Sequence, residues 1–332
     1  MKKLRWWFKI LNLKFAIIKN KIFVLLNKKA FKNKIAIVSS QKWKYKVSED
    51  ILLKDAINKM NVDVDIIAWE DENIDYAKYD IIVIRSVWGF QHNIDKFRIW
   101  LSVLKSYDLR VINSLDVIDA TLSKYEQFKI LDKYGIKHIE TEFIFKKNIM
   151  TSLSNIVSTK YSNGTFVVKP MISASGINTH IISDNKDLET INVRSLDKTF
   201  SKILEDINNG IMIQPFIDGI KDGEYSLVFI NKNLVYAIKR YPGLFVGVMN
   251  VEELALDKVN PNLIEIAKSI VAIPELSNSL FCRVDFAKSN DEYLVMELEY
   301  LDPQLFFKVI KNKSKQNDVV NLFAKEIVKQ LK

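Results

Sequence analysis

The feature that most constrains the fold is a pair of short segments near the C-terminal end, residues 281–287 and 293–303. Both alternate apolar and polar residues with a period of two, which is typical of half-buried strands. A polar break, Ser-Asn-Asp-Glu at 289–292, separates them. The two segments are therefore predicted to pair as a β-hairpin.

One face of this hairpin is charged, because it carries Arg283, Asp285, Glu297 and Glu299. If Asp285 lies opposite Glu297, Arg283 lies opposite Glu299, and all four side chains come within reach of one another. This register needs an odd-length turn or a bulge around residues 288–292. A two-residue turn at 290–291 would otherwise place Asp285 and Glu297 on opposite faces.

Three neighbouring carboxylates repel one another unless a cation neutralises them. A hard divalent ion such as Mg²⁺, with Mn²⁺ as the alternative, binds oxygen ligands and shares them with phosphate. A solvated sheet face is the competing interpretation, since charge on an exposed strand face is ordinary. The hairpin alone does not decide between the two.

The composition is that of a globular chain, with 332 residues, 48% hydrophobic and 27% charged, enough for two or three domains. The only cysteine, Cys282, excludes an internal disulfide and any cysteine-based zinc site. It fits a reducing compartment, so a cytoplasmic location is expected. The sequence has no apolar run of membrane-spanning length.

The net charge of +9 belongs to an N-terminal extension, residues 1–34, which holds ten lysines, one arginine and no acid. The remainder is nearly neutral, which argues against nucleic acid as a partner. Two interpretations of the aromatic-rich extension stay open. It is either an interfacial helix on the inner face of an anionic membrane or an arm that packs on its own protein or a partner. A homodimer is also left open.

Residues 35–115 alternate strand and helix patterns. Strands are expected at 34–40, 62–69, 79–85 and 110–114, with helices after the first and third. The run at 79–85 is almost continuously apolar, as in a parallel strand buried on both faces. This order predicts an open α/β sheet with a ligand crevice at the carboxyl ends of its strands, where Arg85 and Asn113 lie.

A second segment has features of a phosphate-binding site. The strand 165–170 ends in Lys169, and the loop 173–179 is made of small residues. A lysine at a strand end and backbone N–H groups in such a loop can surround a polyphosphate. This is not a P-loop, whose glycine-rich segment precedes its lysine. Alone, the signal is weak.

The order of the motifs is more specific. It runs Ser-Lys124-Tyr, Val-Val-Lys169-Pro, Ile-Gln214-Pro-Phe-Ile, Gly-Glu224-Tyr-Ser, Lys239-Arg240-Tyr-Pro, Arg283-Val-Asp285 and Glu297-Leu-Glu299. Over residues 35–308 it resembles the ATP-grasp superfamily, and within it the subset of the cycloserine-biosynthesis enzyme and prokaryotic glutathione-synthetase-like proteins. The resemblance implies an α/β fold with α+β lobes. An open α/β domain (35–115) is followed by a central lid lobe (116–213) and a C-terminal lobe (214–332) that clamp ATP.

The resemblance also implies roles for individual residues. ATP would be held by Lys124, Lys169, Ser175, Gly176, Gln214, Pro215, Phe216 and Ile217, with Asp218 or Glu224 on the ribose. Asp285, Glu297 and Glu299 would hold Mg²⁺. Lys239, Arg240 and Arg283 would supply positive charge at the reacting groups.

The implied activity is ATP-dependent ligation of a small-molecule or peptide carboxylate to an amine, a thiol or a ureido-type nucleophile through an acyl phosphate. One departure from the family pattern bears on it. After Lys-Arg-Tyr-Pro the chain has Phe245-Val-Gly-Val, so a basic residue expected near Val246 is missing. The alternative is therefore a catalytically impaired ATP-binding module docked through residues 1–34.

Overall fold

The structure is a computed structural model and describes residues 33–107, 109–145, 160, 164–173, 178–183, 210–242 and 249–331. The chain divides into two compact units. The first is Met1–Asp116 with Leu301–Phe307 and Asn312–Lys332; the second is Val117–Tyr300 with Lys308–Lys311. The extension before residue 33, Ser175, Gly176 and Val246 lie outside the described residues, and the predicted domain boundaries stay a prediction.

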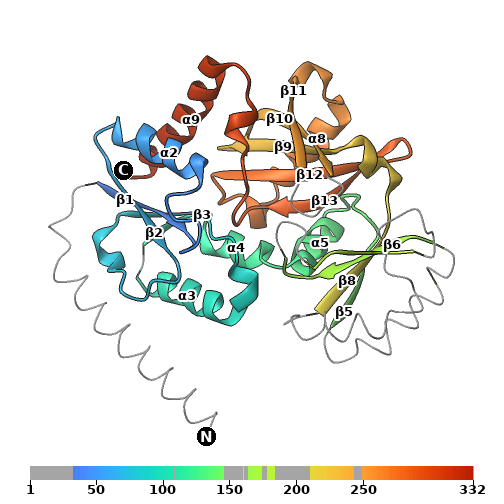
Figure 1. Cartoon of the computed structure of the whole chain (residues 1–332), viewed down its shortest axis with the longest axis horizontal. Coiled ribbons are helices and arrows are strands. Elements are labelled where there is room, and N and C mark those ends of the chain that lie inside the picture. The colour runs from blue at the N-terminus through green and yellow to red at the C-terminus, as the bar shows by residue number, and fades with distance from the viewer. Residues whose placement is uncertain are drawn as a thin grey trace, which may run out of the picture. The chain divides into compact units, whose positions relative to one another are not determined.

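The first unit contains a four-stranded parallel sheet in the order β2-β1-β3-β4 (Figure 1). Its strands are β1 (Lys34–Ser39), β2 (Asp63–Ala68), β3 (Ile81–Ser86) and β4 (Arg110–Ile112). Its helices are α2 (Ser48–Asn58), α3 (Ile94–Ser106) and α9 (Lys313–Val328), with α4 (Leu115–Thr121) at the boundary. Every residue of β3 is buried, as its apolar run predicts. The predicted open α/β sheet is confirmed.

Arg85, at the carboxyl end of β3, is buried and holds two distant parts of this unit together. Its Nη2 donates to Glu49 Oε2 on α2 at 3.1 Å, and its Nη1 donates to the carbonyl of Pro303 at 3.1 Å. Glu49 accepts in turn from the backbone N–H groups of Leu305 (2.9 Å) and Phe307 (3.3 Å). The guanidinium is thus a structural tie between β3, α2 and the segment 301–307.

Breaking this buried ion pair should destabilise the first unit. We expect Glu49→Gln to lower the free energy of unfolding by about 3 kcal/mol, because buried Arg85 would lose its hydrogen-bonded carboxylate and keep only Asp50, 3.6 Å from its Nε, as a charged partner. The matched control is Glu72→Gln, whose carboxylate is exposed and pairs with Lys96 at 2.9 Å; its cost should stay below about 1 kcal/mol. All six tryptophans precede residue 117, so tryptophan fluorescence in urea reports on this unit. Equal effects of the two variants would contradict the prediction.

Asp50, next to Glu49, gives this unit a pH dependence. Burial raises the pKa of Asp50 to about 6, against the opposing effects of Arg85 and a hydrogen bond from Ser86. Since the folded state holds this proton more tightly than the unfolded chain, stability is greatest at acid pH and falls as the pH rises from about 4 to about 6.

The loss from this one group should be about 3 kcal/mol, from a pKa shift of about two units. Asp50→Asn cannot ionise, so we expect the variant to gain stability relative to the wild type as the pH rises from 4 to 7. Urea unfolding at several pH values measures the difference. A difference that stays constant over this range would show that Asp50 does not titrate as described.

The second unit is built on two sheets. An antiparallel five-stranded sheet has the order β11-β10-β9-β12-β13, and a four-stranded sheet has the order β5-β8-β6-β7 (Figure 1). The larger sheet consists of β9 (Glu224–Ile230), β10 (Asn233–Pro242), β11 (Met249–Leu254), β12 (Phe281–Ser289) and β13 (Glu292–Glu299). The smaller consists of β5 (Glu142–Phe145), β6 (Phe166–Pro170), β7 (His180–Ile182) and β8 (Gly210–Pro215).

The described part of this unit also contains α5 (Lys124–Lys133) and α8 (Pro261–Val271). The buried side chains of α8 share an apolar cluster with one face of the larger sheet, including Leu227, Val284 and Leu298. That packing leaves the other face of β9, β12 and β13 for polar side chains. None of the helices in the described part of the chain combines the length and apolarity needed to cross a bilayer.

Candidate functional site

The predicted hairpin register is confirmed, but the irregularity that produces it lies elsewhere than predicted. Asp285 pairs with Glu297 and Arg283 with Glu299. The turn is the two-residue Asn290-Asp291, with Asn290 in the left-handed region at φ 53°. The register shifts instead between Asp285 and Phe286, which pairs with Val295, so that Met296 is the extra residue. The expectation of a bulge or odd turn around 288–292 was therefore wrong in position.

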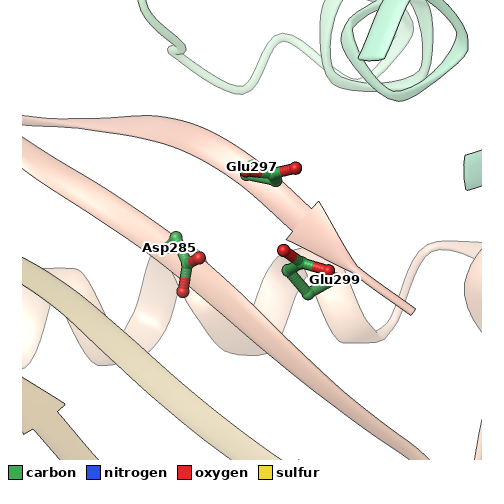
Figure 2. Close-up of side chains that lie close together, drawn as sticks. All are labelled: Asp285, Glu297 and Glu299. Atoms are coloured by element: carbon green, nitrogen blue, oxygen red, sulfur yellow. The ribbon is translucent and has the colours of Figure 1, made fainter. Parts of the chain in front are cut away.

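The bulge puts three carboxylates on one face. Figure 2 shows Asp285 on β12 and Glu297 and Glu299 on β13, and one carboxylate oxygen from each lies within 4.8 Å of the others. The same face carries Glu224 and Ser226 of β9 and Arg240 of β10, as the strand pairings require. The face is therefore lined by ionisable side chains from four neighbouring strands.

Asp285 is held by two arginines and a serine. Its Oδ1 accepts from Arg283 Nε at 2.8 Å and from Ser226 Oγ at 2.6 Å, and its Oδ2 lies 2.9 Å from Arg283 Nη2 and 2.8 Å from Arg240 Nη2. Burial by itself would raise the pKa of Asp285, but the two guanidinium groups outweigh it and lower that pKa to about 2. Asp285 is therefore ionised throughout the physiological range.

Glu297 and Glu299 differ in their neighbours. Burial opposes ionisation of Glu297, but Lys124 and Lys169 outweigh it and lower its pKa; the Lys124 Nζ–Glu297 Oε1 distance is 2.6 Å. Burial and the nearby Glu297 carboxylate raise the pKa of Glu299 to about 7, although Arg283 Nη2 donates to Glu299 Oε1 at 3.2 Å. The negative charge around Glu299 is thus only partly compensated by the protein.

The carboxylates fit a hard divalent cation. All the donors are oxygen, their spacing allows shared coordination, and the raised pKa of Glu299 marks uncompensated negative charge that a cation would relieve. Glu297 and Glu299 would supply ligands directly. Asp285 would coordinate the cation in competition with Arg240 and Arg283, which form ion pairs with it.

The lysines predicted for phosphate approach the same place. Lys169 lies on β6, and burial followed by the nearby Lys124 lowers its pKa to about 8. Lys124 begins α5, and its Nζ donates to the Ser173 carbonyl at 3.0 Å as well as contacting Glu297. Both predicted lysines are therefore brought to the carboxylate cluster.

The two candidates for the ribose lie in different environments. Glu224 pairs with Arg240 at 2.9 Å and follows Gly223, whose φ of 102° suits glycine. Asp218 is exposed and pairs with Lys221 at 3.0 Å. The structure brings Glu224, and not Asp218, to the charged face.

Gln214, Pro215, Phe216 and Ile217 form the end of β8 and the chain after it. Gln214 is buried, and its Nε2 donates to Thr141 Oγ1 at 2.9 Å. Ile217 is buried in the apolar cluster of this unit. These residues lie together in the chain as predicted, and their proposed contact with adenine stays a prediction.

Lys239 is not brought to the cluster. It neighbours Arg240 on β10, and adjacent residues of a strand point to opposite faces. Its Nζ lies 5.2 Å from the ring centres of both Tyr225 and Tyr241. The structure therefore separates Lys239 from Arg240 and Arg283, with which it was grouped from the sequence.

Two further residues shape the site and were not predicted. Ser226 donates to Asp285 and accepts from Arg240 Nε at 2.8 Å. Gln127 of α5 accepts the backbone N–H of Leu298, between the two glutamates of β13, at 2.9 Å. Ser226 follows Glu224 by two residues, so strand periodicity offered a signal for it; for Gln127 the sequence offers none.

The chain is similar in sequence and structure to several known proteins. Residues 35–113 match the family model described as D-cycloserine synthetase DcsG, N-terminal domain. The cycloserine biosynthesis protein DcsG of Streptomyces lavendulae is 23% identical over 295 residues, which cover 84% of this chain and 93% of that protein. The crystal structure of D-cycloserine synthetase DcsG superposes with a TM-score of 0.72 at 18% identity, covering 90% of this chain and all of that one.

A D-alanine–D-alanine ligase from Bacillus anthracis, complexed with ATP, matches with a TM-score of 0.62 at 16% identity over 90% of this chain and 99% of that one. The ATP-grasp ligase PsnB, complexed with a precursor variant, Mg and ADP, matches with a TM-score of 0.58 at 13% identity over 91% of this chain and 100% of that one. The chain has the ATP-grasp fold. It is similar to the cycloserine synthetase, and the two other matched proteins are ligases.

Proposed function

We propose that this ATP-grasp protein is an ATP- and Mg²⁺-dependent ligase that joins a carboxylate to an amine, with a thiol or a ureido-type group as the alternative nucleophile. The observation that carries the proposal is the bulged hairpin, which gathers Asp285, Glu297 and Glu299 within 4.8 Å. A purely structural sheet face has no need of three close, mutually repelling carboxylates, one of them buried and two partly buried.

The reaction that suits this site begins with attack of the substrate carboxylate on the γ-phosphorus of ATP. The bond from that phosphorus to the β–γ bridging oxygen breaks, giving an acyl phosphate and ADP. The nucleophile then attacks the acyl carbon, phosphate leaves, and the nucleophile loses its proton. Mg²⁺ would neutralise phosphate charge during the first step.

The side chains of this unit would mainly bind and orient the reactants. Lys124 and Lys169 would contact the phosphates, and Glu224 would hold the ribose. Arg283 and Arg240, held in place by Asp285 and Ser226, would present positive charge to the transferring phosphoryl group and the substrate carboxylate. Catalysis would rest on positioning and charge neutralisation.

Nucleotide binding is the first test. With Mg²⁺ and a non-hydrolysable ATP analogue at about 100 times its Kd, the free energy of unfolding should rise by about 2.7 kcal/mol, seen as a higher melting temperature. No stabilisation at millimolar nucleotide would reject both the ligase and the alternative, a catalytically impaired ATP-binding module.

The metal ligands are tested by Glu297→Gln in a screen for ADP release over carboxylate and amine pairs. With a productive pair, we expect the variant to lose Mg²⁺-dependent ADP release by at least about 100-fold, because a neutral amide binds Mg²⁺ poorly. The matched control is Glu292→Gln on the same strand, an exposed glutamate paired with Lys137, which should behave like the wild type. Full turnover by Glu297→Gln would refute the metal assignment, and nucleotide binding without ADP release for any pair would favour the impaired module.

A further inference from the structure

The Lys124 ammonium contacts Glu297, one of the proposed metal ligands. Its side chain is 5% exposed, and its Nζ lies 2.6 Å from Glu297 Oε1. The same ammonium donates to the carbonyl of Ser173 at 3.0 Å and to its Oγ at 3.3 Å. An ammonium is a donor only, and both residues offer it oxygen acceptors. Protein groups alone therefore hold the Lys124 ammonium against Glu297.

The helix that carries Lys124 is fixed to the strand that carries Glu297. One turn further along α5, Gln127 Oε1 accepts from Leu298 N–H at 2.9 Å, while its Nε2 donates to the Thr121 carbonyl at 2.7 Å. The backbone N–H of Lys124 donates to the Met171 carbonyl at 2.9 Å. The contact between Lys124 and Glu297 thus follows from anchored backbone on both sides and not from a flexible surface side chain.

An ammonium in this position opposes a metal ion on the same carboxylate. Two cations close to one partly buried carboxylate repel each other, because the effective dielectric there is lower than in water. A triphosphate changes this balance, since its oxygens offer Lys124 another anionic partner and offer the metal additional ligands. Departure of Lys124 from Glu297 and arrival of the metal would then occur together.

Resting on the proposed function, we propose that Lys124 is an internal counter-ion of Glu297 that makes metal binding depend on the nucleotide. The site takes a divalent ion well only with a triphosphate and binds the free ion weakly. If Lys124 were solely a phosphate ligand, its removal would weaken nucleotide binding and leave binding of the free metal unchanged.

Titration of the full chain with Mn²⁺ in the absence of nucleotide, followed by the electron paramagnetic resonance signal of free Mn²⁺, separates these cases. We expect Lys124→Met to bind Mn²⁺ at least about tenfold more tightly than the wild type, because the competing charge is gone. Lys124→Arg keeps the charge and should stay within about twofold of the wild type.

The matched control is Lys129→Met, on the same helix but exposed and paired with Glu126; it should leave Mn²⁺ affinity unchanged. Lys124→Gln, which retains a donor for Ser173, provides the same test if Lys124→Met does not fold. Mn²⁺ affinity that is unchanged or weaker in both uncharged variants would overturn the inference.

Calorimetric titration of the wild type with Mg²⁺ and the ATP analogue tests the proposed function separately. Binding of the analogue, together with unchanged Mn²⁺ affinity in the uncharged variants, would reject the counter-ion role alone. Absence of binding by the wild type would reject the proposed function, whatever the Mn²⁺ titrations show.

Discussion

The second unit depends on a balance of buried and partly buried charge. Four carboxylates face four cationic side chains across the larger sheet, α5 and β6: Glu224, Asp285, Glu297 and Glu299 against Lys124, Lys169, Arg240 and Arg283. An isolated buried charge costs several kcal/mol, so neither set would be stable without the other. The balance is uneven in detail, however: Asp285 pairs with two arginines, whereas burial and the Glu297 carboxylate raise the pKa of Glu299 to about 7 against the opposing charge of Arg283.

This balance depends on a single β-bulge, at Met296 of β13. With the two-residue turn at 290–291 and a regular ladder, Asp285 would pair with Met296, and Glu297 would turn toward the apolar side. The bulge at Met296 corrects the register for Glu297 and Glu299 together. The edge beside it is fixed by other segments: Val295 exchanges backbone hydrogen bonds with Lys137 and Ile139, and Gln127 accepts from Leu298. The geometry of the carboxylates therefore depends on the fold of the whole unit.

The local pattern of the sequence was enough to predict the hairpin strands and the open α/β sheet of the first unit, and to suggest the pairing of Asp285 with Glu297. It did not predict β11. It could not locate the bulge, since the contacts at that edge come from residues far away in the chain. Periodicity places Ser226 on the face of Glu224, but its contact with Asp285, 59 positions away, depends on the order of strands in the sheet. The contact of Gln127 with Leu298, 171 positions away, likewise depends on tertiary packing. Lys239 is a different case, because the period of two that was applied to the hairpin would already have separated it from Arg240.

The two units use buried charge in different ways. In the first, Glu49 is bound by Arg85 and by two backbone N–H groups, and Arg85 also donates to a backbone carbonyl. Backbone partners cannot leave without unfolding the segments that carry them, so this cluster is structural although Arg85 lies at a strand end where ligands often bind. In the second, the carboxylates pair mainly with side chains, which can rearrange without unfolding a backbone segment. This difference makes the second cluster, and not the first, the candidate for chemistry.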